Sequence, residues 1–420
     1  MVPPQLLLLY ALWLILTFFF SLSMVTFIKN RGIFHAQRPE ISEKPPVAII
    51  VPAYNEEANI ANTIESVLSI NYPRDCFEVV IINDGSKDGT GEICRKYAGE
   101  GLITYLENNP NIGKAASLNR GIEYADTEYV ICIDADTVIE KDIIQKTLPY
   151  FDSDDVAAVT SAIKVKNPKT WMQKIIEVEY AVGNGFYNKI WSLLNCMFVT
   201  PGQFSIYRRE KVLEVGGFDR NNLVEDMELA YRMNKAGMKI AVCTSATAHT
   251  VVPATVKDFY YQRKRWYTGT IQTILKHRDV VFNPGLGSFG TYFVPFNYGG
   301  TVLAIMLSIS FLWIILSSLS ISLSNLGLIG FDILSQMKMM VRYAEWDPFN
   351  ASIYQMLGLS PLLMNFIVTY VALKSMGHRV RDNLLGYFGF IFFFIPYQII
   401  WGLSMYFVAF KREVKWRAGM

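Results

Sequence analysis

Two carboxylates close a very apolar segment of the sequence. The stretch "ICIDADT" places Asp134 and Asp136 two residues apart, directly after a run of mostly β-branched side chains. In an extended chain, side chains two residues apart point to the same side. Like charges this close repel each other unless a cation or a proton lies between them, and hard divalent ions prefer oxygen ligands. The pair therefore predicts a Mg²⁺ or Mn²⁺ site that assists the departure of a diphosphate.

Further acidic residues follow other predicted strands. Glu56 follows the strand in "VAIIVPAYNEE" (47–57), and Asp84 follows the strand in "FEVVIINDGSKDGT" (77–90). "LITYLEN" and "EYVICIDADTVI" (128–139) read as two more strands, and segments with helical spacing separate all four. This alternation predicts a parallel sheet with helices on both faces. Such sheets bind ligands at the carboxyl ends of their strands, so we expect these carboxylates to share one edge. Each of them alone could equally be a helix cap or a turn residue.

One lysine lies close to the same predicted edge. Lys114 occurs in "NIGKAAS" at the start of a predicted helix. The sequence has neither G-x-G-x-x-G after the first strand nor the G-x-x-x-x-G-K-[ST] phosphate loop. Lys114 therefore either reaches a phosphate as a point charge or has a structural role.

A second acidic pair opens a predicted amphipathic helix. "VGGFDRNNLVEDMELAYRMNKAGMKI" (215–240) has a Gly-Gly turn followed by Glu225 and Asp226. Carboxylates at a helix start are stabilised by the helix dipole, which is one interpretation. The other is a general base that takes a proton from an attacking hydroxyl. One base suffices when the leaving group is a metal-bound diphosphate, whereas a glycosidase needs two carboxylates that flank the bond.

The stretch "YQRKRWYTG" (261–269) concentrates cations and aromatic rings. It could bind nucleic acid, anchor the chain at a membrane surface, or belong to an active site. The chain has 39 basic and 37 acidic residues and a net charge of +2, which argues against a nucleic-acid partner. On a helix, Gln262, Arg265 and Trp266 are spaced i, i+3, i+4 and share one face. Lys264 is then free to point to lipid headgroups or water.

The composition predicts a membrane protein. The chain is 51% hydrophobic and 18% charged, whereas soluble domains are about a quarter charged. Residues 1–28 carry no charge and are long enough to span a bilayer. "MVPPQ" lacks the basic start of a signal peptide, so we expect a retained helix at 1–30. Lys29, Arg31 and Arg38 follow it and predict a cytoplasmic location for the next segment.

The far end of the chain predicts about three more spans, near 293–318, 352–373 and 384–410. The uncharged stretch 280–331 has room for two, so their number stays open. Basic residues flank the last span on both sides, which leaves the side of the C-terminus open. These residues are Lys374, Arg379 and Arg381 before it and Lys411, Arg412, Lys415 and Arg417 after it.

Five motifs occur in a fixed order: "PAYNEE", "NDGSKDGT", "DAD", "VED" and "QRKRW". With the apolar spans, this order resembles the family 2 glycosyltransferases with a Rossmann-like GT-A fold. Within that family it is similar to the membrane-embedded processive branch, which comprises cellulose, chitin, hyaluronan and poly-N-acetylglucosamine synthases. The Q-x-x-R-W motif separates that branch, and the resemblance covers residues 47 to about 270. It implies an α/β GT-A domain at 40–280 with interfacial helices at its C-terminal end, and transmembrane helices at 1–30 and 290–410.

The resemblance implies a role for each motif residue. Asp136 would bind the divalent metal and Asp226 would be the general base. The nucleotide-sugar would be bound by Tyr54, Glu56, Asp84, Lys114 and Asp134, and the acceptor and diphosphate by Glu225, Gln262, Arg265 and Trp266. The family usually has Thr-Glu-Asp where this chain has Val224-Glu225-Asp226, a mild departure.

The implied activity is that of a metal-dependent, inverting hexosyltransferase in the plasma membrane. It would polymerise a β-linked polysaccharide from a cytoplasmic UDP-sugar, with UDP-GlcNAc expected by analogy, and export it through its own helices or with accessory subunits. A non-processive enzyme that adds one sugar to a polyprenyl phosphate or glycolipid is the alternative. A non-catalytic receptor is disfavoured because Asp136 and Asp226 are both present. The remaining expected partners are the growing glycan or lipid acceptor and the bilayer, with no nucleic acid.

Overall fold

The computed structural model describes residues 4–32, 43–328, 353–392 and 394–410, together with positions 38, 39, 41, 332 and 334. The chain divides into two compact units. The smaller comprises Met1–Met24 and Phe296–Ile367, and the larger comprises Val25–Pro295 and Val368–Met420. The basic residues after position 410 lie outside the described residues.

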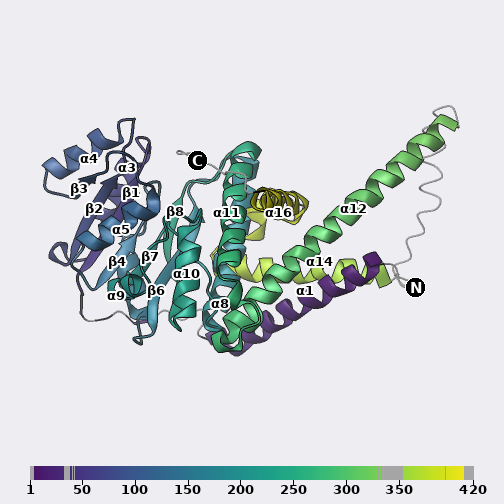
Figure 1. The fold of residues 1–420 in the computed structure, drawn as a ribbon, viewed down its shortest axis with the longest axis horizontal. Helices are drawn as coiled ribbons and strands as arrows, with labels where there is room; N and C mark the ends of the chain where they lie inside the picture. Colours follow the sequence, from purple (N-terminus) through teal and green to yellow (C-terminus); the bar gives the residue numbers. More distant parts are fainter. Residues whose placement is uncertain are drawn as a thin grey trace. The chain divides into compact units, whose positions relative to one another are not determined.

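An eight-stranded sheet forms the centre of the larger unit, with the order β3-β2-β1-β4-β7-β6-β8-β5 (Figure 1). Its strands are β1 (Val47–Ala53), β2 (Phe77–Asn83), β3 (Thr104–Glu107), β4 (Tyr129–Cys132), β5 (Val138–Ile139), β6 (Val156–Val165), β7 (Ser205–Arg208) and β8 (Lys239–Thr250). Strands β3, β2, β1 and β4 are parallel, as the sequence predicted. The alternating pattern ends with β4. Beyond that strand the sheet is mixed, because β7 runs antiparallel to both β4 and β6.

The strands are apolar on both faces because helices cover both sides of the sheet. Along β1, Val47, Ile49 and Val51 pack into one core with helices α3 (Ile60–Leu68), α4 (Thr90–Gly99) and α6 (Ile143–Thr147). Ala48 and Ile50 point the other way, into a core with α5 (Lys114–Tyr124), α9 (Arg209–Glu214) and α10 (Glu225–Lys235). This period of two decides which face of the sheet each strand residue points to.

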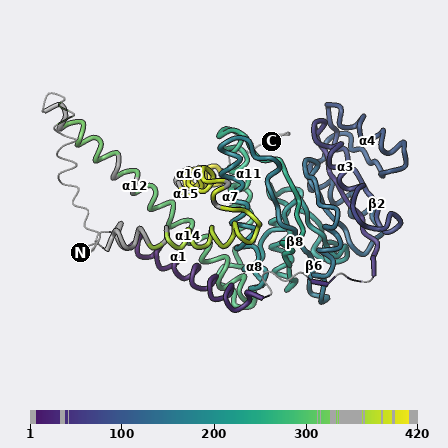
Figure 2. Tube along the Cα trace, turned by 180° about the vertical axis from the view of Figure 1, so that it is seen from behind, coloured from purple at the N-terminus to yellow at the C-terminus, as the bar shows by residue number. Residues whose placement is uncertain are grey.

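Helices α7 (Trp171–Val182) and α11 (Val256–Lys276) follow β6 and β8 in the chain. A π-helical turn (Gly183–Tyr187) joins α7 to α8 (Asn188–Leu193). Helix α11 packs along α16 (Phe394–Ala409), and α7 packs along α15 (Leu384–Phe392) (Figure 2). Two apolar C-terminal helices therefore lie directly against the two helices that flank the sheet.

Two described helices are long and apolar enough to cross a membrane, Leu7–Lys29 and Phe289–Ser310. A pair bent by 50°, Leu384–Ile391 with Pro396–Ala409, would make a third. They belong to α1 (Pro4–Lys29), to a π-helix (Phe289–Phe293) continued by α12 (Val294–Leu328), and to α15 with α16. The region of the predicted span near 352–373 forms α14 (Ile353–Ser375), of which Leu363–Ser375 is apolar but shorter than a full span. Membrane association is thus supported by length and composition.

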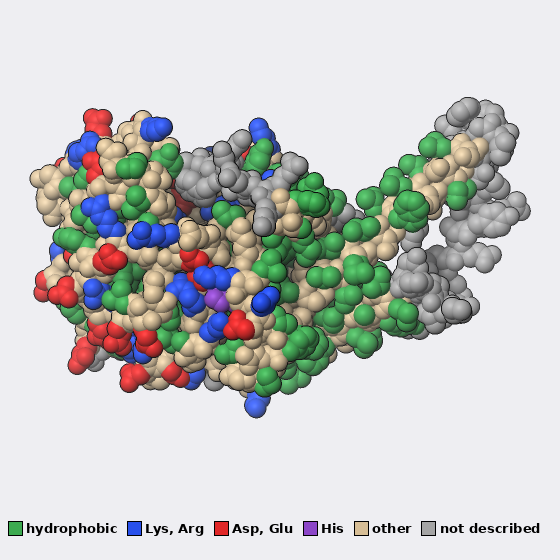
Figure 3. Space-filling view, in the orientation of Figure 1, with side chains coloured by type: hydrophobic (Ala, Val, Ile, Leu, Met, Phe, Trp, Pro, Cys, Tyr) green, Lys and Arg blue, Asp and Glu red, His purple; other side chains and the backbone are tan. Residues whose placement is uncertain are grey.

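The smaller unit holds most of α1 and α12 together with part of α14. Trp13 Nε1 donates to Ser360 Oγ at 2.6 Å, and the rings of Phe18 and Phe19 pack against Phe296. On the face drawn in Figure 3, many hydrophobic side chains lie on the surface that these helices form. Leu14 and Trp313 belong to these helices and are 60% and 73% exposed. Apolar surface of this kind is what lipid tails would cover.

Candidate active site

The carboxyl ends of β1, β2 and β4 open into a cavity of about 320 Å³. Its wall includes eight of the eleven side chains singled out from the sequence: Tyr54, Glu56, Asp84, Lys114, Asp134, Asp136, Glu225 and Arg265. The expected gathering of carboxylates at one sheet edge is therefore observed. Asp226, Gln262 and Trp266 do not line this cavity.

Asp84 is buried and holds the loop after β3 in place. Its Oδ1 accepts from Asn108 Nδ2 and from the Ile112 N–H, and its Oδ2 accepts from the Gly113 N–H, each at 2.9 Å. A carboxylate has about four acceptor positions, so most of them are occupied within the protein. Asp84 thus shapes the cavity wall, and little of its hydrogen-bonding capacity faces the cavity.

Lys114 joins the two acidic motifs. Its Nζ lies 2.7 Å from Asp134 Oδ1 and 3.0 Å from Glu225 Oε1. Burial disfavours its charged form, but Asp134 and Glu225 raise the pKa of Lys114 well above its usual value. Gly202 leaves room for this pair, because a Cβ there would lie 2.7 Å from Lys114 Nζ. Lys114 therefore links the acidic residues that follow β4 to the start of α10.

Asp136 lies among other carboxylates. Burial and then the charges of Asp134 and Glu56 raise the pKa of Asp136 to about 7. No described group of three or more His, Cys, Asp or Glu side chains forms a complete metal site. Mg²⁺ is usually held by one or two carboxylates plus substrate phosphates. The crowded, hard oxygen donors around Asp136 fit such a partial site, in which a diphosphate would complete the ligand shell.

Asp226 is the second residue of α10. Its backbone oxygen accepts from Thr200 Oγ1 at 2.9 Å, and its Oδ1 accepts from the Met227 N–H at 2.8 Å. Burial and the charge of Glu225 raise the pKa of Asp226 to about 6, although Lys114 acts in the opposite direction. A carboxylate with this pKa is a better proton acceptor than an ordinary aspartate and is still mostly ionised at neutral pH.

Helix α11 passes close to the start of α10. A Cβ on Gly269 would lie 2.7 Å from a methyl of Val224, so only glycine allows this approach. From the same helix, Arg265 reaches the cavity wall. Burial acts to raise the pKa of Glu225, but the charges of Lys114 and then Arg265 lower it. The side-chain oxygen of Gln262 is buried and accepts no hydrogen bond from a described residue. Val224, the residue that departs from Thr-Glu-Asp, is therefore the contact that sets the distance between the two helices.

Residues 45–269 match the sequence profile of the family described as "Glycosyltransferase like family 2". The chain belongs to this family. The match covers more than half of the chain, and all eleven candidate residues fall inside it. The fold class inferred from the motif order is confirmed.

Two curated relatives of this glycosyltransferase are poly-beta-1,6-N-acetyl-D-glucosamine synthases. The one from Staphylococcus aureus (strain COL) is 30% identical over 243 residues, which are 57% of this chain and 58% of the relative. The chain thus aligns with a little over half of that relative's length. The one from Staphylococcus epidermidis is 26% identical over 379 residues, which are 89% of this chain and 85% of the relative.

A solved structure supports the fold. The mannosyltransferase PcManGT from Pyrobaculum calidifontis, in complex with GDP-Man and Mn²⁺, superposes with a TM-score of 0.55 at 19% identity. The match covers 88% of this chain and 98% of that one. It shows that the glycosyltransferase has the same fold, a GT-A sheet with flanking helices.

The loop before α10 brings three residues to the cavity that the sequence analysis missed: Arg220, Asn222 and Leu223. They follow the Gly-Gly turn, which the sequence marked only as a turn. Asn222 Nδ2 donates to Thr273 Oγ1 at 2.9 Å, and its Oδ1 accepts from the Val224 N–H. The available signal in the sequence is the charge of Arg220, five residues before Glu225.

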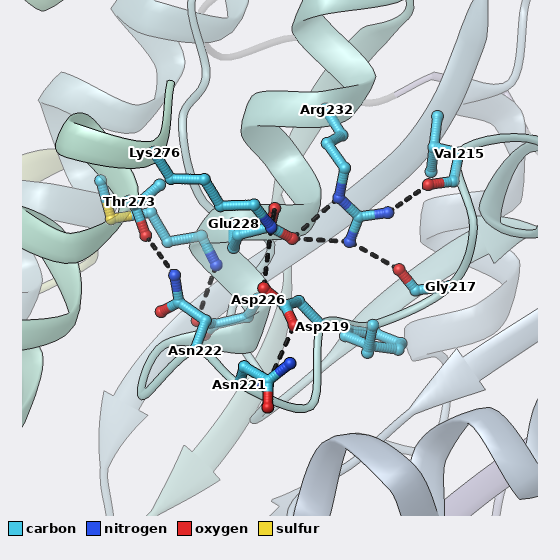
Figure 4. A network of polar contacts seen from close by, with 12 residues as sticks. Val215, Gly217, Asp219, Asn221, Asn222, Asp226, Glu228, Arg232, Thr273 and Lys276 are labelled. Carbon is cyan, nitrogen blue, oxygen red and sulfur yellow. Dashed lines mark hydrogen bonds and ion pairs between the residues drawn. The ribbon is translucent and has the colours of Figure 1, made fainter. Parts of the chain in front are cut away.

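A polar network centred on the buried Glu228 holds this loop against α10 and α11 (Figure 4). Glu228 is fully buried and accepts from Arg232 Nε at 2.8 Å, from Lys276 Nζ at 2.6 Å and from His277 Nε2 at 3.0 Å. Burial raises its pKa, but these hydrogen bonds lower the pKa of Glu228 to about 2. Arg232 in turn donates to the backbone oxygens of the Gly-Gly turn region, Val215 and Gly217. The loop position is therefore fixed by charge-assisted hydrogen bonds.

Proposed function

We propose that this glycosyltransferase is an inverting, processive enzyme that polymerises a β-linked polysaccharide from a cytoplasmic UDP-sugar. UDP-GlcNAc is the proposed donor, because the curated relatives are poly-β-1,6-N-acetyl-D-glucosamine synthases. The observation that carries the proposal is a single cavity that joins Asp134 and Asp136 to Glu225 and Arg265, with Asp226 directly adjacent in the chain. The proposed donor- and diphosphate-binding groups therefore line one cavity, and the proposed base is the residue that follows Glu225 in α10.

In the proposed reaction, an acceptor hydroxyl attacks the anomeric carbon of the donor sugar. The new carbon–oxygen bond forms as the bond to the diphosphate breaks, and the hydroxyl proton passes to the carboxylate of Asp226. The configuration at the anomeric carbon inverts, so an α-linked donor yields a β-linkage. UDP leaves with the bonding electron pair.

The other side chains would bind and orient the substrates. Tyr54 and Glu56 would contact the nucleoside, in a pocket whose wall Asp84 shapes. A divalent ion bound at Asp136 would neutralise charge on the leaving diphosphate. Arg265 would pair with the same diphosphate as a planar, permanently charged donor, and Lys114 would keep Asp134 and Glu225 oriented. Gln262 and Trp266 would hold the acceptor sugar.

The membrane arrangement completes the proposal. The cavity would face the cytoplasm, where nucleotide-sugars are made, and the product would leave through the apolar helices of the same chain or with accessory export subunits. The two or three candidate spans support a role at a bilayer. The alternative activity, one sugar added to a polyprenyl phosphate or glycolipid, uses the same chemistry and differs in product length.

The test is an assay of membranes that carry the full chain. They are incubated with UDP-GlcNAc, UDP-glucose or GDP-mannose and Mg²⁺ or Mn²⁺, and released nucleotide and product length are measured. UDP-GlcNAc is expected to give UDP and a polymer, and a chelator is expected to stop both. A product with one sugar per lipid would contradict polymerisation. Nucleotide release after the chelator has removed all divalent metal would contradict the role of Asp136. No nucleotide release from any donor would contradict glycosyl transfer.

A further inference from the structure

Arg263 is the largest fully buried side chain among the described residues, with 1% of its surface exposed. It lies two residues before Arg265 in the "QRKRW" stretch but does not line the cavity. Its guanidinium Nη2 lies 2.7 Å from Glu179 Oε2 on α7. Burial disfavours the charge, but Glu179 raises the pKa of Arg263 above its usual value. The two arginines of one motif therefore occupy different environments.

The Arg263 guanidinium also lies over aromatic rings. Its central carbon is 4.1 Å from the ring centroid of Trp266 and 5.1 Å from that of Phe259, both on α11. A cation at this distance over an indole face is a favourable contact, and more so where water is excluded. Trp266, the proposed acceptor platform, is thus packed on one side by a guanidinium that an ion pair holds in place.

The same carboxylate connects α16 to this cluster. Tyr397 Oη donates to Glu179 Oε2 at 2.5 Å, and its ring centroid is 5.8 Å from the Arg263 guanidinium. One turn along each helix, the rings of Tyr267 and Trp401 stack at 4.1 Å with an interplanar angle of 12°. Glu179, Arg263 and Tyr397 therefore join α7, α11 and α16 at one point, which we call the Glu179 cluster.

Stability alone does not account for this cluster. A buried ion pair loses so much solvation that apolar residues of similar size often stabilise a fold equally well. The surroundings are already apolar, with Val165, Met172, Ile176 and Ile400 in one core beside it. An ion pair does more than stabilise, because it fixes the orientation of the guanidinium, which is planar and donates hydrogen bonds at fixed angles. The group that this orientation fixes is the Trp266 ring.

We propose that Arg263 is a positioning residue: together with Glu179 and Tyr397 it holds the Trp266 ring at the acceptor site and couples helix α16 to that site. The inference rests on the proposed function, because it gives Trp266 an acceptor glycan to bind. It assigns the two arginines separate tasks, with Arg265 on the diphosphate and Arg263 behind the acceptor platform. A disturbed cluster should weaken acceptor binding and leave donor binding intact.

The test compares Arg263→Lys with Arg208→Lys in membranes that carry the full chain. Arg208 is a matched control, because it also pairs with a carboxylate, Glu128 at 3.0 Å, and lies 5.5 Å from the rings of Tyr129 and Phe151. It does not line the cavity. The KM for UDP-GlcNAc, the KM for a short N-acetylglucosamine oligosaccharide, and product length are measured for each.

Arg263→Lys is expected to raise the oligosaccharide KM about tenfold, the equivalent of one charge-assisted hydrogen bond. It should shorten the product and leave the donor KM unchanged. UDP released beyond one per transferred sugar is also expected, because water can attack the donor sugar when the acceptor hydroxyl is poorly held. Tyr397→Phe should act in the same direction and less strongly, since the ion pair remains. Arg208→Lys should change neither KM. An oligosaccharide KM and product length equal to those of Arg208→Lys would overturn the proposal, as would an equal rise in both KM values.

Hydrogen exchange separates failure of this inference from failure of the proposed function. In Arg263→Lys, amides of α16 (Phe394–Ala409) are expected to exchange faster, while those of β1 and β2 keep the wild-type rate. This readout needs no substrate, so it holds even if the wild-type chain turns over none of the donors. Unchanged exchange in α16 would refute the coupling, and unfolding of the whole sheet would show that Arg263 is only structural.

Discussion

The cavity has two sides: a strand side, formed by the residues that follow β1, β2 and β4, and a helix side, formed by the start of α10 and by α11. On the strand side, backbone N–H groups hold the side chains in place, whereas on the helix side other side chains do so. Asp84 illustrates the first case, with two N–H groups of the 108–113 loop bound to its carboxylate. The Val224–Gly269 contact and the Glu228 network illustrate the second. A loop tied to a buried carboxylate by several hydrogen bonds opens less readily than a contact between helices made by few side chains. We therefore expect donor binding to be robust and transfer to be sensitive to packing.

The largest expected effect is the loss of kcat in Asp226→Asn, which changes only the helix side. Asp226→Asn removes the proposed proton acceptor on the helix side and leaves the strand side intact. The kcat for transfer should fall roughly 10²- to 10⁴-fold, with the KM for UDP-GlcNAc nearly unchanged. Measured initial rates across donor concentrations give both numbers. Wild-type turnover in this variant would remove Asp226 from the mechanism.

A packing change tests whether the helix side depends on contact distance. Gly269→Ala places a methyl 2.7 Å from Val224, and an overpacked contact forces helices apart. We expect a loss of about tenfold in kcat/KM for transfer, because small misplacements of a positioned group are costly. Val224→Ala in the same chain makes room and should restore most of the rate. Failure of the double variant to recover would mean that the spacing of α10 and α11 is not what limits transfer.

The pH profile sharpens the comparison further. Because the pKa of Asp226 is raised to about 6, the base is ionised above that pH and protonated below it. The kcat for transfer should therefore fall as pH drops below about 6, by about tenfold per unit. The residual rate of Asp226→Asn should lack this limb. A limb that persists in the variant would assign it to another group.

The smallest effect is expected on the strand side. Asp84→Asn replaces one acceptor oxygen by an amide nitrogen and leaves the Ile112 or Gly113 N–H without its partner. Such a loss costs about 1–3 kcal/mol of stability. The loop should loosen and the KM for UDP-GlcNAc should rise a few-fold, with kcat unchanged. Thermal unfolding checks the loss of stability, and initial rates across UDP-GlcNAc concentrations check the rise in KM. A large fall in kcat would contradict the assignment of Asp84 to the cavity wall.

Local patterns predicted much of the strand side. The strands that end before Glu56, Asp84 and Asp134 occur where alternating strand and helix signals placed them, because burial on both faces demands continuous apolar runs. The start of α10 at Glu225 also matches its sequence signal. These patterns do not give the partner of each side chain. Asp84 was predicted to bind the nucleotide-sugar, and in the structure most of its acceptor positions are occupied by the loop after β3.

By itself, the sequence determined the family, the four parallel strands and the carboxylates at their ends, since periodicity and motif order are properties of the chain alone. Only the tertiary structure decided that β7 runs antiparallel, that Lys114 joins the two acidic motifs, and that Arg263 turns inward while Arg265 reaches the cavity. Helical spacing shows which residues share a face. The element that packs against that face decides which partners their side chains have. For Arg263 that element is α7, which supplies Glu179 from more than eighty residues away.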